Sequence, residues 1–462
     1  MELSQPVYNL LDTGKSRLFA AAIVCSFSLF WAAFWTPYLL AGLLGALFVA
    51  VFISSRTFRW LVFPTVLILN QYILLNSGIS FLFVGLFIQP VDWVALLLIT
   101  TVLFKKAFTG ERVWVQTGLE LPIWIFLGAI AIGLFKAPDL KAGMVNWGHQ
   151  VLFFVTFYAM VADWKDVAQE RIWKVYFLWA VAAAASALWQ FFISGGGRSL
   201  GFARMALNAL VLPVLCFELA RLSLMKNPKR WVLVVAFVVA AVASQTRGLW
   251  LSIGVLLAVW LFSGCFLKPF KLIAARRVVS KFVTLIFLLL LVFFLLAPFL
   301  GQAERRAVQL GQQSGTVYLR FFLWGLAWQL FWAHPVTGIG MGQFAAVVER
   351  FPEMKNLAIF EWTRGLSAHN LTLTFLAETG LVGTIAFLAL LISIVRLAWK
   401  AVRKTRTLEA LSLAWGFFLL FLVLAISLLF AGVWNYEVAF FMALLVLFAR
   451  KLETPLERTN AS

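Results

Sequence analysis

The stretch HPVTGIGMGQF (334–344), followed after a polar run by SAHNLTLTFLAETGLVG (367–383), interrupts an otherwise apolar chain. Helices that cross a membrane need connections of only a few residues, yet residues 301–370 form a segment too long and too polar to lie inside lipid. Two of the three histidines of the chain, His334 and His369, lie within it. We therefore expect this segment to cover a functional site, with the rest of the chain as its scaffold.

Composition places the rest of the chain in a membrane. Of its 462 residues, 63% are hydrophobic and only 12% are charged, with a mean hydropathy of +0.95, whereas soluble chains carry about 25% charged residues. The net charge of +19 resides in short clusters between apolar runs, without a basic domain or a zinc-ligand spacing, which excludes a nucleic-acid partner. The three cysteines lie in or beside apolar runs, so neither a disulfide framework nor a metal site is expected.

Apolar runs of about 20 residues, long enough to cross a bilayer, recur along the chain. They lie at 18–35, 38–54, 60–76, 90–104, 119–135, 148–163, 172–193, 205–220, 231–245, 249–266, 282–300, 371–395, 410–430 and 433–449. The neighbours 231–245 and 249–266 are short and are separated only by SQTRG, so either could be an incomplete span. The sequence predicts an all-α polytopic membrane protein with about 12–14 transmembrane helices and one large loop that contains short helices.

The distribution of the 38 lysines and arginines predicts the orientation of these spans. Most of them fall in one alternating set of connections, at 15–17, 56–59, 105–112, 165–174, 221–230, 268–281, 396–406 and 450–458. The positive-inside rule makes this set cytoplasmic. The predicted order is a cytoplasmic tail (1–17), an N-terminal transmembrane bundle (18–300), an outward-facing loop (301–370), C-terminal transmembrane helices (371–450) and a cytoplasmic tail (451–462).

Few cations remain on the outward side, and three of them are arginines in two short connections. Arg198 and Arg204 belong to GGGRSLGFAR, and Arg247 belongs to SQTRG. They could simply snorkel to the lipid headgroups. Alternatively they bind an anionic substrate, because guanidinium groups hold phosphate oxygens in a bidentate manner. Arg320, in the aromatic segment 316–333 of the large loop, is a fourth candidate.

The large loop also supplies the candidate general base. His369 precedes an apolar run, with Asn370 as a possible helix N-cap. The helix dipole there disfavours imidazolium, so a neutral ring could accept a proton from a sugar hydroxyl, or the ring could merely cap the helix. His334 before a proline suits a structural hinge, and Gly338 and Gly340 allow a tight backbone path that could present amide groups. We expect Glu378, deeper along the same helix, to have a structural hydrogen-bonding role.

Four segments in order resemble one family. These are GFARMALNALVLP (201–213), SQTRGLWL (244–251), Arg320 ahead of HPVTGIGMGQF, and HNLTLTFLAETGLVG (369–383). Together they resemble the O-antigen ligase and polymerase superfamily of integral-membrane glycosyltransferases. The similarity covers about residues 190–395, and residues 1–170 contribute only a compatible pattern of spans.

The resemblance implies a transferase that uses a glycan linked to undecaprenyl diphosphate as its donor. For an O-antigen ligase of lipopolysaccharide biosynthesis, the acceptor is a sugar hydroxyl of the lipid A–core oligosaccharide at the periplasmic face of the inner membrane. The family implies a catalytic role for His369 and phosphate contacts for Arg247 and for either Arg198 or Arg204. No cofactor is implied, because arginines can stabilise the charge of the leaving diphosphate without a metal ion.

Other functions stay open at this stage. An O-antigen polymerase, or an oligosaccharyltransferase that modifies protein serine or threonine, would use the same donor with a different acceptor, which these motifs do not record. A flippase or other transporter of lipid-linked glycans would carry inverted repeats and polar residues at mid-membrane. The candidate ionic residues cluster at one face instead, which favours an enzyme.

Overall fold

The protein is described by a computed structural model. The described residues are 37–77, 81–83, 86–110, 115–165, 167, 169–194, 206–225, 229–244, 246–266, 316–348, 368, 370–428 and 436–453. Every apolar run of the sequence that falls within these ranges forms a helix, whereas 18–35 and 282–300 lie outside them.

The helices of the first half are α3 (Pro37–Ser54), α4 (Arg56–Ser77), α5 (Pro90–Thr109), α6 (Glu120–Leu134), α7 (Leu140–Trp164) and α8 (Gln169–Ile193). Those that follow are α9 (Ala206–Leu224), α10 (Arg230–Ala243), α11 (Arg247–Phe266), α14 (Thr316–Ala333), α15 (Phe344–Val348), α18 (Leu371–Lys404), α19 (Leu408–Ser427) and α20 (Tyr436–Glu453). The helix predicted over 316–333 and a short helix after Gln343 are both present, as α14 and α15.

By length and composition, three described helices can cross a membrane: Arg171–Ile193 within α8, α18 and α19. The helices Leu44–Ser54 and Arg56–Leu69 are bent by 119° relative to each other at the break between them. If they count as one broken span, the number of candidates is four. The helices α6 and α10, with 15 and 14 residues, are shorter than the usual span. The fold is therefore that of a helical multi-pass membrane protein. The expected number of about 12–14 spans depends in part on segments outside the described residues.

One short element was not expected from the sequence. The strands β1 (Phe81–Phe83) and β2 (Leu86–Ile88) pair antiparallel between α4 and α5, with Phe81 opposite Ile88. Aromatic and β-branched residues favour strands, but a six-residue apolar stretch beside two spans has no distinct periodicity. This hairpin is the one departure, among the described residues, from an all-α fold.

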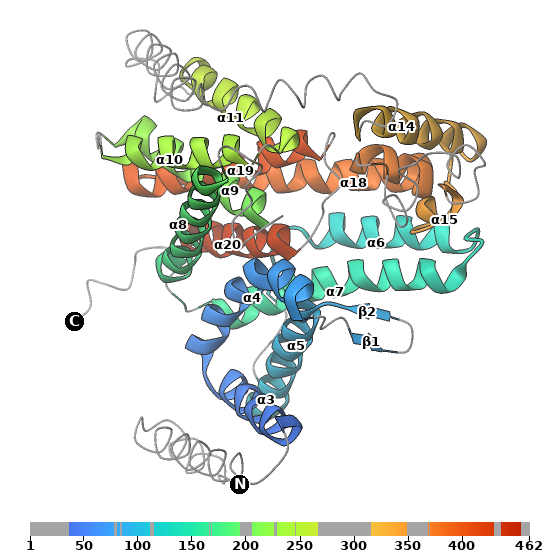
Figure 1. Ribbon diagram of the computed structural model, residues 1–462, viewed down its shortest axis with the longest axis horizontal. Coiled ribbons are helices and arrows are strands. Elements are labelled where there is room, and N and C mark those ends of the chain that lie inside the picture. Colours follow the sequence, from blue (N-terminus) through green and yellow to red (C-terminus); the bar gives the residue numbers. More distant parts are fainter. Residues whose placement is uncertain are drawn as a thin grey trace.

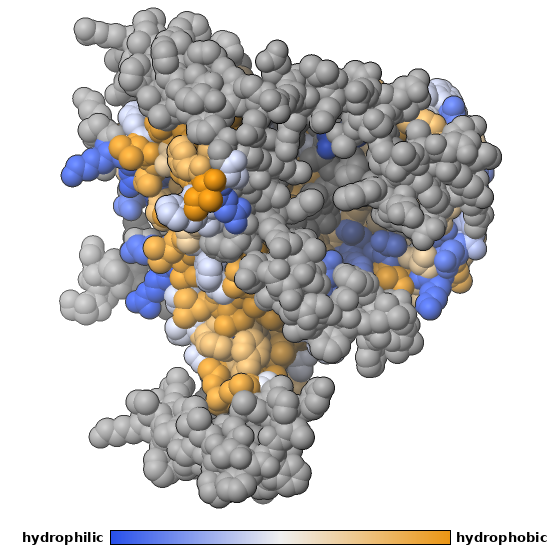
Figure 2. Space-filling model, in the orientation of Figure 1, coloured by the Kyte–Doolittle hydropathy of each residue, from blue (hydrophilic) through white to orange (hydrophobic). Residues whose placement is uncertain are grey.

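Side chains of one large core hold most of the bundle together. The helices α9 and α19 pack closely, because Gly416 of α19 faces the ring of Phe217 and a Cβ atom at position 416 would overlap that ring. Small residues let helix backbones approach in this way inside membranes. Exposed large hydrophobic residues such as Leu103, Phe104 and Phe108 cover α5, and the surface over α4 and α5 is hydrophobic in the lower part of Figure 2.

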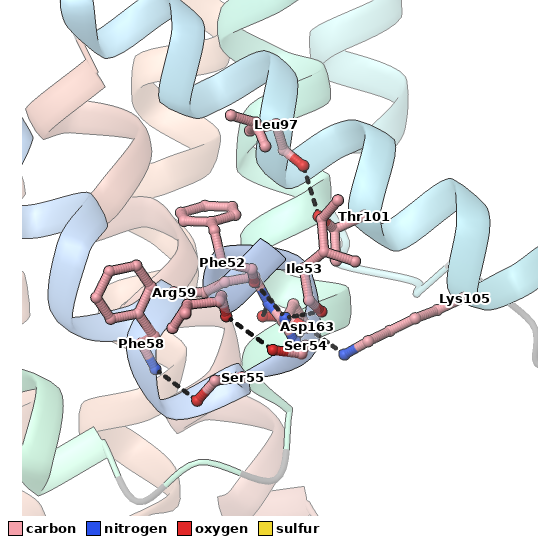
Figure 3. Close-up of polar contacts among 11 residues, drawn as sticks. Phe52, Ile53, Ser54, Ser55, Phe58, Arg59, Leu97, Thr101, Lys105 and Asp163 are labelled. Atoms are coloured by element: carbon pink, nitrogen blue, oxygen red, sulfur yellow. Dashed lines mark hydrogen bonds and ion pairs between the residues drawn. The ribbon is translucent and has the colours of Figure 1, made fainter. Parts of the chain in front are cut away.

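Charged side chains are buried where α3 meets α4. Arg59 has no exposed surface, although its position suggested a loop cation. Its Nε and Nη2 atoms donate to the Asp163 carboxylate at 2.7 and 2.8 Å, and Nη1 donates to the carbonyl oxygens of Phe52 and Ile53, each at 2.8 Å (Figure 3). Lys105 Nζ lies 3.4 Å from Asp163 Oδ1. The guanidinium thus binds carbonyl groups that the end of α3 leaves without helical partners.

A second core, separate from the first, lies between α14, α15 and the start of α18. It contains Leu323, Leu326, Ala327, Phe344, Val348, Ala368 and Ala377. In Figure 1, α14 and α15 lie beside α18 and near the turn between α6 and α7, at the right-hand end of the view. The candidate site is built on this small core.

Candidate functional site

The helix α18 is broken near its beginning. Gly380 has φ 61° and ψ −158°, which is not helical, so residues 371–379 form a first arm and residues 381–404 a second arm. The rings of Phe375 and Phe387 stack with centroids 4.6 Å apart, although 12 residues of straight helix would separate them by about 18 Å along the axis. The two arms are therefore folded toward each other, and both rings contact Phe126 of α6.

The stretch 335–343, here called the clamp, satisfies the backbone groups that the break leaves without partners. In an unbroken helix, the amides of Leu381 and Val382 would donate to the carbonyls of Ala377 and Glu378. Instead those amides donate to Pro335 O and Val336 O at 2.8 and 3.2 Å. The carbonyls of Ala377 and Glu378 accept from the amides of Ile339 and Gly340, both at 2.9 Å. Four bonds to the clamp thus replace two helical bonds.

Two glycines allow this close approach of backbones. Gly338 (φ 68°) lies against the backbone of Glu378, and Gly380 lies against the backbone of Val336. A Cβ atom at either position would overlap backbone atoms far inside van der Waals contact, and a positive φ is unfavourable for other residues. The amides of Gly338 and Gly340 donate within the protein, to the carbonyls of His334 and Glu378.

Glu378 and Gln343 extend the clamp in two directions. Glu378 is 6% exposed, and its Oε1 accepts the amide of Phe344 at 3.0 Å. Gln343, which is 1% exposed, donates from Nε2 to Asp139 O at 2.8 Å and accepts the Asp139 amide on Oε1 at 3.1 Å. The expected structural role of Glu378 is consistent with these contacts. Its place differs from the expectation, because the folded arm brings it to the turn between α6 and α7 rather than deeper into the bundle.

The helix α14 packs along the first arm and runs in the same direction. Trp324 Nε1 donates to the carbonyl of Ala368 at 2.9 Å, and the clamp, which follows α14, bonds to Leu381. The residues from Trp324 to Pro335 span about 16 Å at the rise of a helix, and the residues from Ala368 to Leu381 span a similar length. The two segments are therefore parallel. We call α14, the clamp, α15 and the first arm together the α14 unit.

The residues on both sides of position 369 are fixed by this unit. Ala368 has no exposed surface. Asn370 is the N-cap of α18, because its Oδ1 accepts the Leu373 amide at 3.0 Å, and it is 8% exposed. The next amide, that of Leu371, donates to the carbonyl of Leu428 at the end of α19, at 3.2 Å. Ala368, Asn370 and Leu371 therefore lie where α14, α18 and α19 meet.

The predicted site residues differ in how far the structure describes them. His369, Arg198 and Arg204 lie outside the described residues. Arg247 is the first residue of α11, and only its backbone is described. Asn370 caps the helix as expected.

The two remaining candidates lie on α14 and at its end. Arg320 is partly exposed and precedes Trp324 by one turn, which puts their Cβ atoms about 6 Å apart on one helix face. His334 is exposed directly after α14, where its amide bonds to the carbonyls of Leu330 and Phe331.

A chain of hydrogen bonds connects the start of α11 to the same place. Ser252 Oγ of α11 and Ser427 Oγ of α19 are 2.6 Å apart. Ser252 follows Arg247 by five residues, about 8 Å along the helix, and Ser427 precedes Leu428, whose carbonyl binds the Leu371 amide. Ser252 of α11 and Leu371, in the first turn of α18, thus both bond to the end of α19. Arg247 begins α11, and Asn370 is the N-cap of α18.

Trp324, Gln343 and Asp139 organise the site but were not identified from the sequence. Trp324 and Gln343 lie in stretches that the sequence singled out, but each bonds to a residue that is remote in the chain. Trp324 bonds to Ala368, and Gln343 bonds to Asp139, which is 204 residues away. The one local signal is at Asp139, whose side chain accepts the Ala142 amide as the N-cap of α7. Among the described residues, no group of three or more His, Cys, Asp or Glu side chains could hold a metal ion. Metal-independent chemistry stays a prediction.

Residues 232–388 match the model of a protein family described as O-antigen ligase (Wzy_C). The match begins in α10 and includes α11, α14, the clamp, the first arm and the beginning of the second arm. It does not include the end of α19, the contacts from α6 and α7, or the connection that holds Arg198 and Arg204. No curated protein sequence matches the chain.

Proposed function

We propose that the chain is an O-antigen ligase of lipopolysaccharide biosynthesis, because residues 232–388 match the model of the O-antigen ligase family. It transfers a glycan from undecaprenyl diphosphate to a sugar hydroxyl of the lipid A–core oligosaccharide. The protein is a multi-pass membrane glycosyltransferase. In this proposal it resides in the bacterial inner membrane, with its active site toward the periplasm and both termini in the cytoplasm.

One observation carries the proposal. The hydrogen bonds Trp324–Ala368, Leu371–Leu428 and Ser252–Ser427 join α14, α18, α19 and α11. A transferase needs its base and its leaving-group ligands at one place, because correct geometry supplies much of the rate. Helices that are remote in the sequence are joined at residues that are neighbours, in the chain, of the base suggested by the family motif. This arrangement supports a reaction centre there.

The donor diphosphate is held by arginines. Arg320 lies one turn before Trp324 on α14, and Arg247 lies five residues before Ser252 on α11. Trp324 and Ser252 are the residues that bond to Ala368 and to the end of α19. Arg198 and Arg204 precede α9, and one or both would complete the set. Guanidinium groups bind phosphate oxygens bidentately and stabilise the charge that develops on the leaving diphosphate. Truncation of one of them weakens donor binding as well as turnover.

The reaction is a direct displacement with His369 as general base. The acceptor hydroxyl attacks the anomeric carbon while the bond from that carbon to the diphosphate oxygen breaks, and the diphosphate leaves with the electron pair. The neutral imidazole of His369 takes the hydroxyl proton. A position before the N-cap Asn370 favours the neutral ring, because the helix N-terminus carries positive partial charge. One displacement inverts the anomeric configuration.

The acceptor distinguishes this proposal from its alternatives. Purified protein is incubated with a lipid-linked glycan and three separate acceptors: lipid A–core, a second lipid-linked glycan, and a serine- and threonine-rich protein. We expect transfer to lipid A–core, and transfer in excess EDTA. Preferential chain extension of the lipid-linked glycan would make the chain a polymerase, and modified protein would make it an oligosaccharyltransferase. Activity that disappears in EDTA and returns with Mg²⁺ would contradict the arginine mechanism.

A further inference from the structure

We propose that Trp324 is a positioning residue of the transfer reaction: its indole fixes the peptide group before His369 and thereby the place of the general base. This inference rests on the proposed function. Trp324 Nε1 donates to Ala368 O at 2.9 Å. That carbonyl belongs to the planar peptide group whose nitrogen is the amide nitrogen of His369. The hydrogen bond therefore acts on the backbone of the base itself.

On the other side of residue 369, the hydrogen bonds do not involve α14. Asn370 is held by its capping bond to the Leu373 amide, and its carbonyl accepts both the amide and the hydroxyl of Thr374 at 2.9 Å. The Leu371 amide binds α19. The peptide group on the far side of Ala368 leads into residues outside the described ranges. Among the described residues, Trp324 is the only side chain that hydrogen-bonds the peptide group preceding residue 369.

The position of Trp324 is fixed by more than its own helix. Leu323, Leu326 and Ala327 of α14 are buried in the small core with Ala368 and Ala377, and the clamp ties the end of α14 to both arms of α18. The ring of Trp324 also packs against Phe321, with centroids 5.4 Å apart. A donor held this firmly can set the carbonyl position to within a fraction of an ångström. A displacement of about 1 Å at a reacting group can cost on the order of 100-fold in rate.

A single change separates this role from packing. Trp324→Phe keeps an aromatic ring but removes the N–H donor. Trp147→Phe is the matched control, because Trp147 Nε1 also donates to a backbone carbonyl on a neighbouring helix, Leu127 O of α6 at 3.1 Å, and both rings are partly buried. We expect Trp324→Phe to lower kcat by about 10- to 100-fold with unchanged donor affinity, and Trp147→Phe to change kcat less than about twofold.

Coupling to the base is measured by a double-mutant cycle. If Trp324 acts through His369, then Trp324→Phe has no further effect on the residual rate of His369→Ala, because the group that it positions is gone. Equal loss in both backgrounds would show a general structural role and overturn the inference. Full activity of Trp324→Phe beside an inactive His369→Ala would overturn the inference and leave the proposed function intact. Full activity of His369→Ala would instead remove the proposed base.

Hydrogen exchange tests the anchoring without an activity assay. Backbone amides whose anchors are lost open more often and exchange faster. In the full-length protein, exchange of the segment around residues 368–373 should accelerate about 10-fold or more in Trp324→Phe and stay unchanged in Trp147→Phe. The same exchange rate in all three proteins would show that the indole does not hold this peptide group, and the inference would fail.

Discussion

Two helix breaks in this protein are stabilised by opposite means. Between α3 and α4, which meet at 119°, the buried guanidinium of Arg59 binds the carbonyls of Phe52 and Ile53 together with the Asp163 carboxylate. At Gly380 of α18, backbone groups of the clamp make four hydrogen bonds to the amides of Leu381 and Val382 and the carbonyls of Ala377 and Glu378. The first break depends on a buried charge pair, and the second on two glycines.

The difference indicates what each break is for. A side chain can reach the unpaired backbone groups of a break from any direction. Arg59 and Asp163 join α4 to α7, and Lys105 joins α5 to the same carboxylate. Backbone pairing requires contact along several residues, so the clamp and the first arm can hardly move independently. The break at Gly380 therefore fixes the α14 unit to the residues around position 369, whereas the break at Ser55 serves the bundle.

Loss of the arginine should have the largest effect on stability. Arg59→Met leaves the Asp163 carboxylate buried without its bidentate partner and should reduce the free energy of unfolding by about 3–5 kcal/mol. Thermal unfolding in detergent measures this. The double variant Arg59→Met with Asp163→Leu should recover most of the loss, because a buried ion pair can be replaced by apolar groups at little cost. A double variant as unstable as Arg59→Met would show that the carbonyl contacts, and not the charge pair, dominate.

Substitution of the second break should have a somewhat smaller effect that is confined to the α14 unit. Gly380→Ala combines a positive φ with overlap against Val336 and should cost about 2–4 kcal/mol, seen as faster hydrogen exchange in α14 and the first arm. Gly325→Ala is the matched control. Gly325 lies within α14 with open space around it, so alanine there should stabilise the helix by up to about 1 kcal/mol. Equal stability and equal hydrogen exchange of the two variants would show that the close contact between the clamp and Gly380 does not stabilise the α14 unit.

The contact between the clamp and α7 should contribute less. Gln343→Leu removes both hydrogen bonds to the backbone of Asp139 and leaves buried polar groups unpaired, for a loss of about 1–3 kcal/mol. Gln329→Leu, on the exposed face of α14, should be nearly neutral. Comparable unfolding temperatures of the two variants would mean that the clamp is held by α18 alone.

The smallest effect should come from an exposed ion pair at the end of α20. Lys404 and Lys400 lie 2.6 and 3.2 Å from Glu453 Oε1, and their hydrogen bonds lower the pKa of that carboxyl below its usual range. A lowered folded pKa contributes stability above the unfolded value, near pH 4.3, which is lost as the pH falls through the folded value. Because the pair is exposed, Glu453→Gln should cost under about 1 kcal/mol at pH 7. Well below pH 4 the same substitution should not change the stability measurably. A stability difference between the two proteins that does not vary with pH would contradict the ion pair.

The sequence predicted the helices well because each apolar run carries its own information. The run 371–395 and the N-cap Asn370 are local features, and α18 begins there as expected. Gly380, within ETGLVG, gave no comparable signal, although the helix breaks there. A glycine in an apolar run is compatible with a continuous helix and with a break, and only the clamp, about 40 residues earlier in the chain, distinguishes them.

The same limit applies to the site. The types of residues needed for transfer could be predicted from their chemistry and from the family resemblance. Their convergence could not, because it depends on pairs such as Ser252 and Ser427, which are 175 residues apart. The partners of the amides near Gly338 and Gly340 could not be predicted, because a glycine-rich turn is equally suited to binding an anion and to receiving another backbone, as it does here. His369, Arg198 and Arg204 lie outside the described residues, so their roles stay predictions.

The central claim is that His369 removes the acceptor proton in a single inverting displacement, and one assay addresses it directly. Purified parent protein and His369→Ala are compared for donor binding, for transfer from a lipid-linked glycan to lipid A–core, and for the anomeric configuration of the new linkage. A general base typically contributes about 10²–10⁴-fold. We predict an inverted linkage from the parent, and for His369→Ala unchanged donor affinity with a rate reduced by that factor. A retained configuration, or near-parental transfer by well-folded His369→Ala, would contradict the account.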